Sequence, residues 1–197
     1  MTATIGWLAV AIAFALALAG TAAPAALSGR LAARRFTLGA IAIGGQLVLV
    51  TVAALALVYA LVTADFSLQY VAQNTSLRTS LYYRVTGLWA ALEGSLLLWE
   101  WMLVALAGVV AWQYRARHPE LMPWVLAVFS GVSAFFLGVL ALAANPFARL
   151  WPIPPDGRGL NPLLEDADMF THPPLLYAGF VGLTVPYAFA MAALITG

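Results

Sequence analysis

One histidine stands at the joint between a proline-rich loop and an apolar segment. It is His172, in the stretch MFTHPPLLYAGF, and Pro173 and Pro174 after it fit the first positions of a helix. Thr171 or His172 would then cap that helix. A neutral imidazole on a rigid backbone mount suits ligation of a metal such as iron. The residues alone also fit a hydrogen-bonded boundary residue that binds nothing, and the thioether of Met169 is too near in sequence to bind the opposite side of the same iron.

Two carboxylic acids, Glu93 and Glu100, lie within the apolar stretch TGLWAALEGSLLLWEWMLVALAGVVAW. They are seven residues apart, about two helical turns, and Trp89 lies four residues before Glu93. This spacing predicts that the three side chains share one face directed into a helix bundle, because a carboxyl group is costly in lipid. Hydrogen bonding that makes packing specific is one role for the acids, and proton relay or ligand contact is the other.

Polar residues near this stretch allow simpler interpretations. Arg84 is predicted to extend to the membrane interface or to pair with Glu93. Gly94 and Ser95 would let a neighbouring helix approach closely. His118, in RARHPEL, has no other metal-ligating residue type converging on it and is predicted to be a solvated loop histidine.

Aromatic residues divide by depth in the same stretch. Tyr82 and Tyr83 fit an aromatic belt at the membrane boundary, whereas Trp99 and Trp101 lie too deep for a belt and are predicted to pack between helices.

The composition is that of an integral membrane protein. Hydrophobic residues make up 63% of the chain and charged residues 9%, far below the share of about 25% charged residues in soluble domains. The absence of cysteine excludes disulfides, thiolate metal sites and thiol nucleophiles. A net charge of +1 without any lysine argues against nucleic-acid binding.

Five apolar stretches are long enough to cross a bilayer, and they predict an all-α, polytopic membrane protein with a single domain over residues 1–197. The first stretch lacks a positive leading segment and is too long for a signal peptide, so it is predicted to be retained. The predicted helices are approximately 5–27, 38–63, 87–112, 122–144 and 174–196, and the long connections approximately 64–86 and 145–173.

Arginines in the short connections predict the orientation of the chain. The first short connection contains Arg30, Arg34 and Arg35, and the later one contains Arg115 and Arg117. Positive charge favours the cytoplasmic side, so the N-terminus and both long connections are predicted outside and the C-terminus inside. Four apolar residues of the second long connection are predicted to anchor it at the membrane interface: Phe147, Trp151, Leu160 and Leu163.

Three stretches resemble those of the CcmF-type cytochrome c haem lyases, members of the CcmF/CycK/CcsA haem-handling family. They are WAALEGSLLLW, GRGLNPLLED and THPPLLYAGFVG. The resemblance extends to DFSLQYVAQNTS, YYRVTGLW and ANPF, and so covers most of residues 64–185, while the first 60 residues match only in hydropathy. Ala90 stands where the family usually has glycine, and Thr171 where it often has phenylalanine.

The resemblance implies a role in cytochrome c maturation at the outer face of the cytoplasmic (inner) membrane. Haem, b-type while in transit, would arrive on a CcmE-type haem chaperone. It would be joined through its vinyl groups to the cysteines of apocytochrome c, which a CcmH-type thiol-handling subunit serves. His172 would be one external axial ligand of the haem iron, and Trp151, Leu163, Pro173 and Pro174 would pack on the haem or the loop.

The family's tryptophan-rich loop, second external histidine and membrane-buried histidine pair have no counterpart in this sequence. The resemblance covers roughly the N-terminal third of such a lyase, so the chain is predicted to be one polypeptide of a split lyase or a piece of a longer one, inactive alone. Two other functions stay open: a structural membrane subunit that scaffolds a partner without touching haem, and a transporter or proton-conducting subunit that uses Glu93 and Glu100.

Overall fold

The computed structural model describes residues 1–27 and 34–197, and this part of the chain is all-helical apart from an isolated bridge between Leu68 and Arg149. It contains five spans that are long and apolar enough to cross a membrane, which confirms the predicted fold class. The long helices are α1 (Thr2–Ala26), α2 (Arg35–Val62), α5 (Leu92–Tyr114) and α6 (Met122–Leu142), followed by the pair α7 (His172–Gly182) and α8 (Thr184–Thr196). Arg30 lies outside the described residues.

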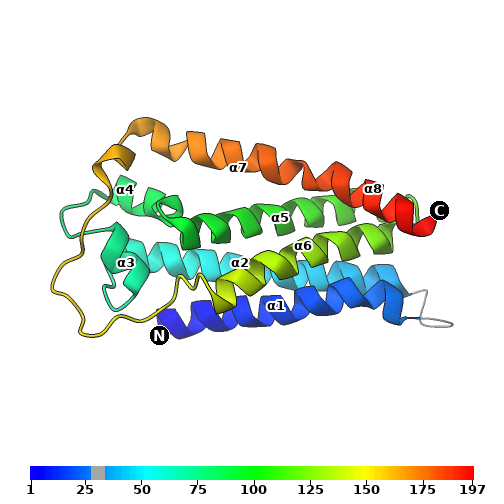
Figure 1. Cartoon of the computed structure of the whole chain (residues 1–197), viewed down its shortest axis with the longest axis horizontal. Coiled ribbons are helices and arrows are strands. Elements are labelled where there is room, and N and C mark those ends of the chain that lie inside the picture. Colours follow the sequence, from blue (N-terminus) through cyan, green and yellow to red (C-terminus); the bar gives the residue numbers. More distant parts are fainter. Residues whose placement is uncertain (28–33) are drawn as a thin grey trace.

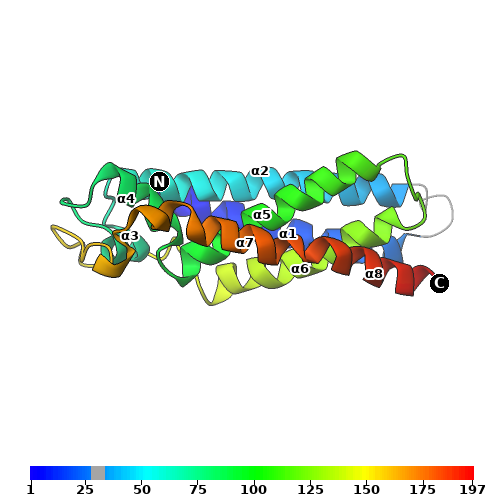
Figure 2. The same ribbon diagram turned by 90° about the horizontal axis from the view of Figure 1, so that it is seen from above.

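The long helices run side by side as an elongated bundle (Figure 1). Helix α1 packs on α2 and α6, and α5 packs on α2 and α6 on the other side. The short helices α3 (Gln69–Asn74) and α4 (Leu81–Thr86) lie at the end of the bundle that holds the N-terminus, and the C-terminus lies at the opposite end (Figures 1 and 2). Both long connections therefore occupy the same end of the molecule.

Helix α5 begins five residues later than predicted. A short 3₁₀ helix, η2 (Gly87–Trp89), precedes it, and Ala91 between them is extended, with φ −141° and ψ 172°. An extended residue breaks the regular repeat of a helix, so residues before and after it do not share a helix face. The prediction that Trp89 shares a face with Glu93 and Glu100 is therefore wrong.

The last span is two helices rather than one continuous helix over 174–196. It begins at His172 and is interrupted at Leu183, between α7 and α8. Pro186 lacks an N–H group to donate to the carbonyl of Gly182, four residues earlier, which accounts for the interruption. Figure 1 shows α7 diverging from the bundle while α8 returns to pack on α6.

The first long connection is fastened by Arg84. Its guanidinium donates hydrogen bonds to four backbone carbonyls, those of Val62, Ser76, Leu77 and Thr79, at 2.9–3.2 Å. The guanidinium is thus bound to backbone carbonyls around the first long connection and is not paired with Glu93, which was one of its two predicted roles.

Backbone hydrogen bonds join the two long connections into one layer over the bundle end. Gln69 N–H donates to the carbonyl of Ala148, and Arg158 N–H to that of Ala72. Gly157 approaches so closely that a Cβ there would lie 2.1 Å from the carbonyl oxygen of Thr75.

Of the four residues predicted to anchor the second long connection at the membrane interface, only two are exposed. Phe147 and Leu160 are buried in the protein, whereas Trp151 and Leu163 are both 86% exposed. The first two residues stabilise the protein core instead of a membrane contact.

Candidate functional site

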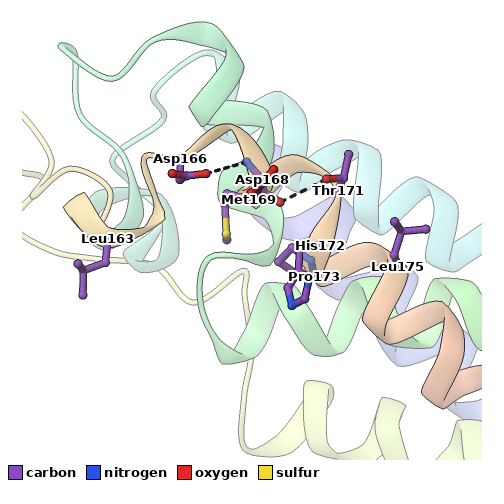
Figure 3. A pocket seen from close by; sticks show the side chains of 8 residues that line it. All are labelled: Leu163, Asp166, Asp168, Met169, Thr171, His172, Pro173 and Leu175. Carbon is purple, nitrogen blue, oxygen red and sulfur yellow. Dashed lines mark hydrogen bonds between the residues drawn. The ribbon is translucent and has the colours of Figure 1, made fainter.

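His172 is the first residue of α7, at the bundle end that carries the long connections (Figure 3). Thr171 is the N-cap, as one of the two predicted arrangements had it, although its side chain makes no capping hydrogen bond. Pro173 and Pro174 follow within the first turn, where a missing N–H group leaves no bond unmade. The imidazole is exposed, and the prolines after it restrict the dihedral angles of the backbone that carries it.

An open pocket of about 580 Å³ surrounds the histidine. The side chains of Met169 and His172 extend in the same direction, whereas that of Leu175 extends away from them (Figure 3). The lining residues are Leu163, Asp166, Asp168, Met169, Thr171, His172, Pro173 and Leu175. The structure thus brings Leu163 and Pro173 to His172, but Pro174 and Trp151 do not line this pocket.

Both aspartates of the pocket take part in the hydrogen bonds of the turn, Asp166 through its carboxylate and Asp168 through its backbone. The carboxylate of Asp166 accepts from the N–H of Asp168 at 2.9 Å and so begins the 3₁₀ helix η4 (Ala167–Phe170), and the N–H of Thr171 donates to the carbonyl of Asp168. Across residues 1–27 and 34–197, no group of three or more His, Cys, Asp or Glu is placed to hold a metal ion. The site therefore offers a metal a single imidazole rather than a closed coordination shell.

Aromatic residues of α4 and η2 hold η4, the turn before His172. The indole N–H of Trp89 donates to the carbonyl of Met169 at 2.8 Å, and the hydroxyl of Tyr82 donates to that of Ala167 at 3.2 Å. The ring of Phe170 stacks on Tyr82, with centroids 5.4 Å apart, and meets Trp89 edge to face at 6.0 Å. Sequence reasoning missed these contacts because they join residues about 80 positions apart.

Hydrogen bonds from side chains of α3 and α5 hold Trp89 and the rest of η2. The hydroxyl of Tyr70, in α3, donates to the carbonyl of Gly87 at 2.8 Å and lies 3.2 Å from that of Leu88. Burial raises the pKa of the Tyr70 phenol far above its usual value, so the hydroxyl keeps the proton that it donates. The hydroxyl of Ser95 donates to the carbonyl of Trp89 at 3.1 Å.

Glu93 and Glu100 both lie on α5, as predicted, but in different surroundings. Glu93 is half-buried in the first turn of the helix, where a carboxylate is favoured, and it lines a small polar pocket of about 170 Å³ with Gln69, Gln73 and Asn145. Glu100 is completely buried between helices. The two acids therefore do not form one continuous polar face.

Glu100 belongs to a chain of buried hydrogen bonds across three helices. The hydroxyl of Ser133, on α6, lies 2.7 Å from Oε1 of Gln46, on α2, and is also hydrogen-bonded to Oε1 of Glu100. The amide nitrogen of Gln46 donates to the carbonyl of Ala42 at 3.1 Å, which fixes the orientation of the amide. One hydroxyl hydrogen cannot serve two acceptors, so the arrangement is satisfied when Glu100 is protonated and donates to Ser133.

The remaining candidates lie away from His172. His118 is exposed in the turn between α5 and α6, at the opposite end of the bundle, as predicted for a loop histidine. Trp99 packs against Phe136 and Tyr177, with centroids 5.8 and 5.7 Å apart, and the indole N–H of Trp101 donates to the hydroxyl of Thr51 at 3.0 Å. Both tryptophans thus join helices to one another.

Comparisons with known proteins give a consistent family. Residues 89–197 match the family model described as Cytochrome C assembly protein. The chain is 39% identical over its whole length to the cytochrome c-type biogenesis protein CcmF of Pseudomonas aeruginosa, and covers 30% of that protein. It is 40% identical over 148 residues to the CcmF of Haemophilus influenzae, which is 75% of this chain and 23% of that protein. The likeness is thus not confined to residues 64–185.

A solved structure agrees with these sequence matches. The chain superposes over its whole length on the cytochrome c haem lyase CcmF, with a TM-score of 0.82 and 35% identity, and covers 31% of that chain. The chain spans less than a third of the length of these relatives. With a family model over more than half of its residues and relatives near 40% identity, the chain belongs to the cytochrome c assembly protein family.

Proposed function

We propose that this chain is part of a membrane haem lyase of cytochrome c maturation, in which His172 is one axial ligand of the iron of the haem substrate. The observation that carries this proposal is the exposed imidazole at an open pocket, in a member of the cytochrome c assembly protein family. The relatives are named as cytochrome c-type biogenesis proteins and a haem lyase, which supports haem as the substrate.

The residues around His172 fit one face of a haem. The imidazole supplies a nitrogen ligand, and Leu163, Met169 and Pro173 give the pocket apolar surface against which a porphyrin packs. Within the described residues the pocket holds one histidine, so we infer that the second axial ligand comes from outside this chain. Trp151 is 86% exposed in the same loop layer and stays a candidate for contact with the porphyrin rim or a partner.

Haem attachment joins the vinyl groups of haem to the cysteine thiols of apocytochrome c. In this proposal His172 holds the iron, the restricted backbone of Pro173 and Pro174 fixes the imidazole, and the apolar lining limits water at the porphyrin face. The site faces the outer side of the cytoplasmic membrane, as the arginine distribution predicts. A CcmE-type haem chaperone would deliver haem there, and apocytochrome c with its CcmH-type subunit would receive it.

A structural subunit that scaffolds a partner is the second candidate, because a rigidly mounted histidine can also serve as a plain helix start. A proton-conducting role has less support, since Glu100 is hydrogen-bonded between helices and Glu93 lies in a separate pocket.

Haemin titration of the purified chain in detergent separates these functions. His172→Ala is expected to abolish the spectrum of imidazole-ligated haem, and free imidazole is expected to restore it in His172→Gly. His118→Ala is the matched control, because it removes the other histidine, at the opposite end of the bundle. A His172→Ala chain that binds haemin with the unsubstituted affinity and spectrum would overturn the ligand role and favour the scaffold.

A further inference from the structure

The geometry points to Trp89 as the residue that positions His172: its indole N–H holds the turn that carries the histidine at a fixed place on the bundle end. This inference rests on the proposed function, in which His172 binds haem iron. Trp89 does not touch the pocket itself, so it acts through the backbone of Met169, three residues before the histidine.

The turn before His172 has few other attachments. Helix α7 buries only Val181 among its side chains, and the prolines after His172 offer no N–H groups. Within the part of the chain that the structure describes, the hydrogen bonds that reach η4 from outside the second long connection come from Trp89 and Tyr82. Of these donors, Tyr82 is 45% exposed, whereas Trp89 is half-buried. The less exposed bond is the firmer attachment, because water competes less for it.

Trp89 is suited to this role because it cannot move independently of the bundle. Its carbonyl accepts from Ser95, and the carbonyls of Gly87 and Leu88 before it face the buried hydroxyl of Tyr70. The hydroxyl of Tyr177, in the second turn of α7, donates to the same Ser95 at 3.3 Å. One small cluster on α5 and η2 thus fixes both the turn before His172 and the helix after it.

The test is Trp89→Phe, which removes the N–H donor and keeps an aromatic ring beside Phe170. The matched control is Trp101→Phe, in the middle of α5 and away from the site. It removes an indole hydrogen bond of 3.0 Å to the hydroxyl of Thr51. If Trp89→Phe unfolds the chain, Tyr82→Phe gives a milder version, since it removes only the hydroxyl bond to Ala167 from an exposed side chain.

The first measurement needs no haem. The chain contains no cysteine, so His172→Cys accepts a single nitroxide label at the site. Electron paramagnetic resonance of this labelled chain in detergent is expected to show a more mobile label when Trp89→Phe is added, and no change when Trp101→Phe is added. A merely stabilising role for Trp89 would lower the unfolding temperature without this local change, and an unchanged label mobility overturns the inference.

The second measurement is haemin titration of the chain with His172 intact. Trp89→Phe is expected to weaken imidazole-ligated binding about threefold to tenfold, because the histidine must then be ordered on ligation. Trp101→Phe is expected to bind as the unsubstituted chain does. Equal affinity of the Trp89→Phe and unsubstituted chains overturns the positioning role. A different result would separate this inference from the proposed function. If Trp89→Phe increases the label mobility but haemin binding does not depend on His172, the proposed function is refuted, whereas the attachment of the turn by Trp89 stands.

Discussion

Gly94 lets α5 make close contact with η2 and with the Tyr70 side chain of α3. A Cβ at this position would lie 1.9 Å from the carbonyl oxygen of Leu88 and 2.3 Å from the hydroxyl oxygen of Tyr70. The sequence predicts that Gly94 and Ser95 admit a neighbouring helix, and the structure shows that the segment admitted is η2 with the Tyr70 side chain. The glycine in WAALEGSLLLW therefore serves the support of Trp89.

Gly94→Ala is expected to destabilise the chain by about 1–3 kcal/mol, the usual cost of overpacking, because the nearest atom is a backbone oxygen. Denaturant titration in detergent, followed by circular dichroism, measures this cost. Gly108→Ala in the same helix is the control, since its nearest neighbour is a flexible Leu47 methyl group at 3.7 Å and alanine favours the helix by up to about 1 kcal/mol. Equal stability of the two variants would contradict the close approach.

Three helices are joined by the buried hydrogen bonds of Gln46, Glu100 and Ser133. Polar groups between membrane helices specify which faces meet, since the apolar side chains of α2, α5 and α6 could pack in other registers. This network is the packing role that the sequence left open for Glu100. Oε2 of Glu100 and the hydroxyl of Ser130 have no protein hydrogen-bond partner among the described residues.

Ser133→Ala is therefore expected to lower the free energy of unfolding by about 1–3 kcal/mol, because it leaves Glu100 and Gln46 buried without their shared partner. Ser130→Ala, one turn away on α6, is the control and is expected to be neutral or stabilising, since it removes a buried hydroxyl without a partner. Glu100→Gln should be better tolerated than Ser133→Ala, because its amide still donates to Ser133. A Ser130→Ala cost equal to that of Ser133→Ala would argue against the network.

The helical spans were predictable from the sequence, but the breaks within them were predicted less well. Apolar length sets the number of spans, whereas hydropathy does not report a dihedral angle, so the extended Ala91 was missed and Trp89 was assigned to the wrong face. The interruption before Thr184 had a signal in Pro186, which the length of the apolar stretch concealed.

On the scale of the whole molecule, the sequence predicts where the site lies better than what surrounds it. An odd number of spans places the termini at opposite ends and both long connections at one end, as the structure shows (Figure 1). The place of His172 at a helix start follows from the two prolines after it. The pocket around it depends on how one long loop folds over another, so Leu163 was found there and Trp151 was not.

The orientation of the bundle is the remaining prediction, and the cysteine-free sequence allows a direct test. Ser80→Cys places a thiol at the end that holds His172, and Ala116→Cys places one in the turn between α5 and α6; both native residues are exposed. In spheroplasts, a membrane-impermeant maleimide is expected to label Ser80→Cys at once and Ala116→Cys only after lysis, because the arginines favour the cytoplasmic side for that turn. The reverse pattern would put His172 in the cytoplasm and exclude haem attachment at the outer face.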